Sequence, residues 1–170
     1  MLILGIDPGT ATTGFGLIKS DKRPVTSNKK RNLSLVAYGC ISTSKDWEMP
    51  KRLWALQSQL KKILLEHRPD VICVEQLFFG ANARTAMTVG QARGVVMAQA
   101  AAQRVPLFEY QGLAIKHKLC GYGRADKKEV ERGVKKILGV RKLEKPQNGY
   151  LDDAVDALAI AIYHFLKISS

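Results

Sequence analysis

The amino-acid sequence predicts a single α/β domain built around a β-sheet of mixed direction. The chain has 170 residues, of which 46% are hydrophobic, and this suffices for one sizeable core rather than two. Short strand-like runs joined by turns come first, and helical and strand patterns alternate after them, as in α/β proteins. We therefore expect one domain over residues 1–170, with helices flanking the sheet.

The amino-terminal part of the chain predicts three strands. Residues 2–7 form an apolar run that ends at a Pro-Gly turn, and residues 13–18 follow a turn rich in Gly and Thr, so the two predict a hairpin. A third strand is expected over residues 35–41. Between them, residues 20–33 are polar and basic, without a large apolar side chain before Leu33, which predicts a basic loop or hairpin tip.

Helices and strands alternate in the rest of the chain. Apolar residues at helical spacing predict a long helix over 47–67, ended by Arg-Pro-Asp. The expected elements after it are a buried strand at 71–74, a helix rich in Ala and Gly at 84–103, a strand at 105–110, short helices at 113–120 and 127–138, and a closing helix at 150–166. This order predicts a sheet with both parallel and antiparallel strands.

Positive charge is concentrated in two stretches. The formal net charge is +12; residues 116–145 hold eleven basic and four acidic residues, and residues 19–31 contribute a further +5. Such segregation is typical of nucleic-acid binding, because side chains that neutralise phosphates release counterions. A solvated basic face is one alternative. A membrane surface is a weaker one, because neither stretch has a bulky apolar face.

Other features indicate a soluble, cytoplasmic protein. No apolar run approaches the ~20 residues that a membrane span needs, and the first residues lack the pattern of a signal peptide. Cys40, Cys73 and Cys120 are odd in number, far apart and mostly set among apolar neighbours. We expect reduced core thiols rather than disulfides or a zinc cluster.

Two acidic residues follow predicted strands directly. Asp7 ends the first strand, and Glu75 follows the buried strand at 71–74. The carboxyl ends of strands in such sheets open onto the crevice where ligands bind. The alternatives are that Asp7 closes the turn at Pro8-Gly9 and that Glu75 marks the point where its strand meets solvent.

The closing helix carries three acids. Asp153 and Asp156 are three residues apart, which places both carboxylates on one helix face. Asp152 and Asp153 could instead be first-turn acids that favour the positive end of the helix dipole. Asp156 resists this explanation because it interrupts an otherwise apolar helix, where an unpaired charge costs several kcal/mol.

If Asp7, Glu75, Asp153 and Asp156 converge, they form an all-oxygen set of ligands. Such a set suits Mg²⁺ or Mn²⁺ and does not suit zinc. Two such ions ~4 Å apart activate a water on one side of a phosphate and stabilise the leaving oxygen on the other. The sequence therefore predicts phosphodiester hydrolysis, with the basic stretches holding the nucleic-acid backbone.

The sequence contains four motifs: GIDPGT at 5–10, VEQLF at 74–78, GQARG at 90–94 and DDAVDALA at 152–159. They resemble motifs of the RuvC family, bacterial Holliday junction resolvases of the RNase H-like superfamily. Their order and spacing match over nearly the whole chain. The resemblance implies an RNase H-like mixed five-stranded sheet and a structure-specific endonuclease that resolves four-way DNA junctions by paired symmetric nicks in recombination and repair.

The resemblance also implies roles for individual residues. Asp7, Glu75, Asp153 and Asp156 would be the catalytic acids that bind two Mg²⁺, with Mn²⁺ as a substitute, and Asp152 looks like an extra neighbour. Lys127 would contact the scissile phosphate or offset charge in the transition state. One of two adjacent rings would stack on bases at the junction centre. The expected DNA contacts are Phe78, Phe79, Lys116, Lys118, Arg124, Lys127 and Lys128.

Partners follow from the same resemblance. A four-way junction is nearly two-fold symmetric, so a homodimer with two identical sites can nick opposed strands. The segment at 90–94 resembles a family segment near the active site and dimer interface, although core packing explains its Ala content equally well. The RuvA and RuvB branch-migration proteins are the implied partners. The basic stretch at 21–31 looks longer than the corresponding family turn.

Three other functions compete with this interpretation. The first hairpin also resembles that of actin-like ATPases and sugar kinases, but those need two such domains. Another RNase H-like nuclease, such as the YqgF type, shares the early Asp-containing hairpin, and substrate preference would distinguish it. A non-catalytic DNA-binding module that kept the fold would lack metal-dependent cutting.

Overall fold

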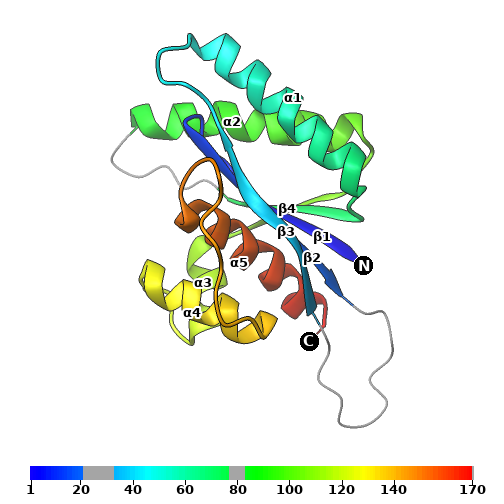
Figure 1. Cartoon of the computed structure of the whole chain (residues 1–170), viewed down its shortest axis with the longest axis vertical. Coiled ribbons are helices and arrows are strands. Elements are labelled where there is room, and N and C mark those ends of the chain that lie inside the picture. Colours follow the sequence, from blue (N-terminus) through cyan, green and yellow to red (C-terminus); the bar gives the residue numbers. More distant parts are fainter. Residues whose placement is uncertain (21–32, 77–82, 170) are drawn as a thin grey trace.

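The structure is a computed structural model that describes residues 1–20, 33–76 and 83–169 (Figure 1). Its strands are β1 (Leu2–Asp7), β2 (Thr12–Ser20), β3 (Leu33–Ser42), β4 (Val71–Glu75) and β5 (Leu107–Tyr110). Its helices are α1 (Met49–His67), α2 (Ala83–Ala102), α3 (Gly112–Cys120), α4 (Lys127–Leu138) and α5 (Leu151–Ile168). The predicted succession of elements is confirmed.

The strands form one sheet in the order β3-β2-β1-β4-β5. The pairs β1–β2 and β2–β3 are antiparallel, whereas β1–β4 and β4–β5 are parallel. Parallel neighbours need a crossover connection, and α2 supplies the one between β4 and β5. The sheet is therefore mixed and five-stranded, as the sequence predicts.

Helices cover both faces of the sheet, α1 and α2 on one side and α3, α4 and α5 on the other (Figure 1). Side chains alternate between the faces along each strand. In β1, Ile3 packs in the cluster with α5, and Leu4 and Ile6 pack in the cluster with α1 and α2. In β4, Cys73 lies on the α5 side and Val74 on the other. The same alternation directs the residues that end these strands toward α5.

Several boundaries differ from those expected. Ser20 and Leu33 are strand residues rather than loop, because the two are register partners in the β2–β3 ladder. Ser20 also pairs with Met1 through two backbone hydrogen bonds. β5 begins two residues later than predicted because the amide of Val105 donates to the carbonyl of Ala100, closing α2. Residues 21–32 lie outside the described part of the chain.

The cysteines are free in the structure, but only one is a core residue. Cys73 is completely buried in β4, whereas Cys40 and Cys120 are half-buried. The prediction of reduced thiols agrees with this, and the prediction of a core position is wrong for two of the three. Cys40 lies on β3, an edge strand of the sheet, and Cys120 is the last residue of α3. Their apolar neighbours in sequence therefore do not enclose either side chain.

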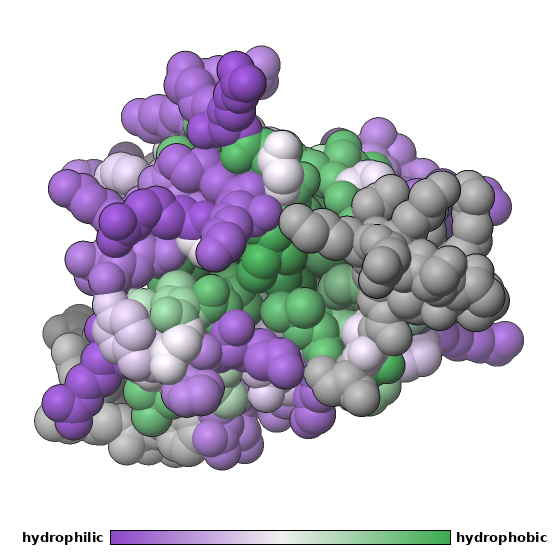
Figure 2. Space-filling view, turned by 90° about the horizontal axis from the view of Figure 1, so that it is seen from below, coloured by the Kyte–Doolittle hydropathy of each residue, from purple (hydrophilic) through white to green (hydrophobic). Residues whose placement is uncertain are grey.

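The surface of the described residues is mixed in polarity. Figure 2 shows one face, on which hydrophilic side chains surround a central apolar strip. Large apolar side chains such as Trp54, Met87 and Leu113 are exposed. None of the helices in residues 1–20, 33–76 and 83–169 is long and apolar enough to span a bilayer.

Candidate active site

Asp7 and Glu75 end adjacent parallel strands. Ile6 of β1 is in register with Val74 of β4, so the next residues, Asp7 and Glu75, lie side by side at the carboxyl edge of the sheet. By the alternation described above, both side chains are on the face that α5 covers. This register brings the carboxyl ends of the two strands together, which meets part of the condition that the four acids converge.

Glycines let α5 approach this edge closely. A side chain at Gly14 would overlap the backbone carbonyl of Asp153, and one at Gly5 would overlap the carbonyl of Ala157. Gly14 is also the register partner of Asp7 across the β1–β2 ladder. The glycine therefore places the backbone of Asp153 directly over the strand pair that carries Asp7. Gly5 opens the GIDPGT motif, but the sequence analysis did not identify the packing role of either glycine.

The four predicted acids influence one another's charge. Burial, and then repulsion from the other three carboxylates, raises the pKa of Asp7 from 3.8 to about 7, against the opposing effect of Lys127. Four carboxylates from three elements thus share one electrostatic environment.

Burial is also the main cause at the other three acids. It raises the pKa of Asp156 to about 6, with Lys127 opposing, and raises the pKa values of Glu75 and Asp153. Lys116 lowers the pKa of Glu75, and Lys127 lowers that of Asp153. Two of the lysines predicted from the sequence therefore lie within electrostatic range of the carboxylates.

Glu75 packs closely against the start of α3. A side chain at Gly112 would overlap the Oε1 atom of Glu75, so only glycine leaves room for the carboxylate in this position. Because Gly112 is the first residue of α3, the carboxylate also lies near the positive end of that helix dipole. The sequence analysis did not identify Gly112.

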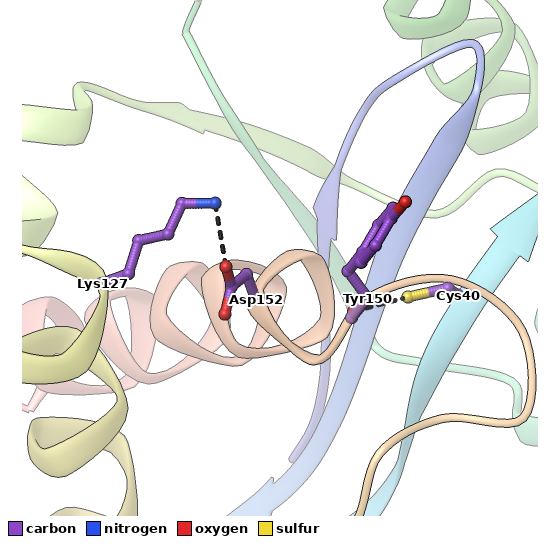
Figure 3. Close-up of polar contacts among 4 residues, drawn as sticks. All are labelled: Cys40, Lys127, Tyr150 and Asp152. Atoms are coloured by element: carbon purple, nitrogen blue, oxygen red, sulfur yellow. Dashed lines mark hydrogen bonds and ion pairs between the residues drawn. The ribbon is translucent and has the colours of Figure 1, made fainter.

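Lys127 begins α4 and reaches α5 (Figure 3). A capping box between Asp126 and Glu129 fixes the start of the helix. The Nζ atom of Lys127 donates to Oδ2 of Asp152 at 3.0 Å. Both side chains are largely exposed, at 68% and 48%, so the pair is accessible to solvent and of small energy. Asp152, an extra neighbour in the sequence analysis, is thus the partner of Lys127.

The segment before α5 is anchored to β3. The Tyr38 hydroxyl donates to the carbonyl of Glu144 and accepts from its amide, at 3.1 and 2.7 Å. Cys40 Sγ donates to the carbonyl of Tyr150 at 3.2 Å (Figure 3). These contacts hold the chain immediately ahead of the α5 acids, and local sequence patterns do not reveal them.

The residues predicted to contact DNA differ in solvent exposure, and two of them are not described by the structure. Lys116 is half-buried in α3, Lys118 is exposed on the same helix, and Arg124 and Lys128 are exposed on either side of the start of α4. Phe78 and Phe79 lie outside the described residues.

The donor chemistry of the four acids suits Mg²⁺ or Mn²⁺, because all the donors are carboxylate oxygens. A divalent cation would also relieve the mutual repulsion that raises their pKa values. As the side chains stand, no group of three or more His, Cys, Asp or Glu residues within the described ranges could hold a metal ion. Coordination would therefore require the carboxylates to turn toward a common point.

Comparisons with known proteins give a consistent result. The family model described as "Crossover junction endodeoxyribonuclease RuvC" matches residues 3–164. A curated protein with that name from Syntrophomonas wolfei is 45% identical over 164 residues, which is 96% of this chain and 88% of that protein. The structure of Thermus thermophilus RuvC has a TM-score of 0.83 at 29% identity, covering 99% of this chain and 96% of the other.

The T. thermophilus RuvC complex with a Holliday junction substrate also has a TM-score of 0.83, at 30% identity, covering 99% of this chain and 94% of that one.

Proposed function

The chain belongs to the RuvC family of crossover junction endodeoxyribonucleases, and from that premise we propose how its own residues resolve a four-way DNA junction. The activity is hydrolysis of one phosphodiester in each of two opposed strands, so that paired symmetric nicks separate the junction in recombination and repair. The observation that supports the site is the gathering of four mutually repelling carboxylates at the carboxyl ends of β1 and β4, under the first turns of α5.

Asp7, Glu75, Asp153 and Asp156 are the proposed ligands of two Mg²⁺ ions, for which Mn²⁺ could substitute. When bound, the ions supply Lewis acidity to the phosphate, an activated water and stabilisation of the leaving oxygen. Without a cation, the raised pKa means that Asp7 holds a proton in part of the population near neutral pH. Occupation of the site therefore requires loss of that proton, which makes metal affinity increase with pH.

Lys127 is the proposed catalytic lysine. It lowers the pKa values of Asp7, Asp153 and Asp156, so its positive charge acts at the position where the phosphate would lie. Its pairing with Asp152 is exposed, and a DNA phosphate could replace that carboxylate at small cost. The lysine would then offset charge that develops on the phosphate in the transition state.

Basic residues around the site are the proposed DNA contacts. Lys116 and Lys118 lie on α3, whose first residue contacts Glu75. Arg124 lies in the connection before α4, and Lys128 follows Lys127 at the start of that helix. Contacts of this kind position the backbone and make binding weaken with salt. Phe78 or Phe79 is proposed to stack on bases at the junction centre.

A homodimer would present two such sites to the two-fold junction. The exposed side of α2 supports this proposal. Met87 and Met97 are 69% and 42% exposed there, and a side chain at Gly94 would meet nothing within 4 Å, so another helix could approach closely. We treat the chain as one nuclease domain that works in the cytoplasm with the RuvA and RuvB branch-migration proteins.

Cleavage of a labelled mobile four-way junction tests the proposed function. A plain duplex and an RNA/DNA hybrid serve as alternative substrates, each with Mg²⁺ and with EDTA. Paired symmetric nicks on the junction alone, abolished by EDTA, are the expected result. Cutting of the hybrid would indicate a different RNase H-like nuclease, and binding without cutting would indicate a non-catalytic module.

Asp156→Asn tests the assignment of the site. Removing one proposed metal ligand leaves the basic surface unchanged, so junction binding should persist within about twofold while cleavage is lost. Cleavage at the wild-type rate in Mg²⁺ would show that Asp156 is not a ligand.

A further inference from the structure

Two arginines with an unusual backbone conformation line the same cavity. Arg68 and Arg104 have φ angles of 49° and 55°, and they are the non-glycine residues with positive φ in the described part of the chain. Both line a cavity of about 510 Å³. Because they come from the ends of two different helices, α1 and α2, chain proximity does not explain the coincidence.

Both arginines occupy positions where helices usually carry glycine. The amide of Arg68 donates to the carbonyl of Leu64, and the amide of Arg104 donates to that of Ala101, so each caps the end of its helix in a left-handed conformation. The chain uses Gly121 and Gly139 for the same purpose after α3 and α4. A side chain in this conformation costs free energy that glycine avoids. Such a local cost suggests that the side chains have a function.

The cavity combines positive charge with apolar walls. Neither guanidinium pairs with a carboxylate within 4.0 Å among the residues that the structure describes, and both arginines are exposed. Asp70 also lines the cavity, but one oxygen of its carboxylate accepts the amide of Leu2 at 2.6 Å. Leu65 and Val105 contribute apolar surface.

The cavity lies at the opposite end of the sheet from the carboxylates. It is built by the residues just before β4 and β5, whereas Glu75 ends β4. Five strand residues separate the two ends, a span of about 16 Å at the usual rise per residue. The cavity and the carboxylates therefore lie at opposite edges of the sheet.

We propose that this cavity is a docking site for a segment of a partner protein that combines acidic side chains with aliphatic side chains such as leucine. Carboxylate side chains of the segment would pair with Arg68 and Arg104, since the planar guanidinium matches a carboxylate in two parallel hydrogen bonds. Aliphatic side chains between them would lie against Leu65 and Val105. The apolar walls favour a peptide with aliphatic side chains over a nucleic-acid backbone, whose repeating unit is a charged phosphate and a polar sugar.

An NMR titration of the isotope-labelled full chain tests the proposal. The probe is a capped octapeptide that alternates Leu and Glu, and the comparison peptide alternates Leu and Gln. The expected result is saturable shifts of the backbone amides in 64–70 and 103–105 with the Glu peptide, and at least tenfold weaker binding of the Gln peptide.

Two double variants make the test specific. Arg68→Gly/Arg104→Gly removes both guanidiniums, and glycine suits the left-handed backbone, so the fold is retained. The affinity for the Glu peptide should fall at least tenfold, while junction cleavage is unchanged. Lys136→Gln/Arg141→Gln removes the same charge from exposed positions in and after α4, and should keep peptide affinity within twofold.

Three results would overturn the proposal. The first is equal peptide binding by the glycine variant and the wild type. The second is equal loss of binding in both double variants, which would indicate attraction to net charge alone. The third is a set of shifts in 64–70 and 103–105 on addition of a 20-base-pair duplex without peptide, which would assign the cavity to DNA.

Discussion

Replacing Asp7 by Asn should stabilise the metal-free protein while abolishing its activity. The carboxylate is charged above neutral pH and lies among three others, whereas the amide of Asn has nearly the same size and no charge. Burial, followed by repulsion from Asp156, Glu75 and Asp153, raises the pKa of Asp7 from 3.8 to about 7. The proposed metal ligand Asp7 is therefore a residue whose charge destabilises the metal-free fold.

The pKa of Asp7 sets the size of this effect. A shift of about 3 units corresponds to about 4 kcal/mol at 1.36 kcal/mol per unit. The buried amide of Asn also loses contact with water, which offsets part of the gain, so we expect the free energy of unfolding to rise by about 2–4 kcal/mol at pH 8.

The sign of the pH dependence follows from the raised pKa of Asp7. Between pH 3.8 and about 7 the folded state binds more protons than the unfolded state, so wild-type stability falls as pH rises. The penalty is absent below pH 3.8 and complete above about pH 7. The advantage of Asp7→Asn should therefore be less than half as large at pH 5 as at pH 8.

Urea unfolding followed by circular dichroism in EDTA measures both quantities. Asp46→Asn, at an exposed acid in the loop before α1, is the matched control and should change stability by less than about 0.5 kcal/mol. Added Mg²⁺ should stabilise the wild type and have less effect on Asp7→Asn. Equal stability of Asp7→Asn and the wild type at pH 8, or a gain independent of pH, would refute the reasoning.

Three further variants have distinct expected outcomes. Gly112→Ala should slow junction cleavage at least tenfold and change urea stability by less than about 1 kcal/mol, because the new methyl group displaces only the flexible Glu75 side chain; unchanged cleavage would contradict this. Lys127→Gln should shift the pH–rate profile to higher pH, because loss of its charge raises the carboxylate pKa values; a slower rate with an unshifted profile would argue against this electrostatic role. Arg68→Gly should raise the free energy of unfolding by about 0.5–1 kcal/mol in the same urea assay, and a loss would show that the guanidinium supports the fold.

Local patterns in the sequence were sufficient for the elements and for the candidate acids. Asp7 and Glu75 end short apolar runs, and Asp156 interrupts an apolar helix, so each stands out from its immediate neighbours. Strand alternation and helix periodicity depend on residues within a few positions, which explains why the order of elements agrees with the structure. The boundaries of elements depend on partners elsewhere in the chain, such as the pairing of Ser20 with Met1, so local patterns did not fix them.

The tertiary structure alone decided which distant residues meet. The close approach of α5 depends on Gly14, the room for Glu75 depends on Gly112, and the partner of Lys127 is Asp152, 25 residues further along the chain. The shared cavity of Arg68 and Arg104 likewise arises from the packing of α1 and α2. The sequence by itself therefore determined which side chains are candidates for the chemistry, since that depends on local contrast. Their geometry comes from long-range packing between elements that no local pattern encodes.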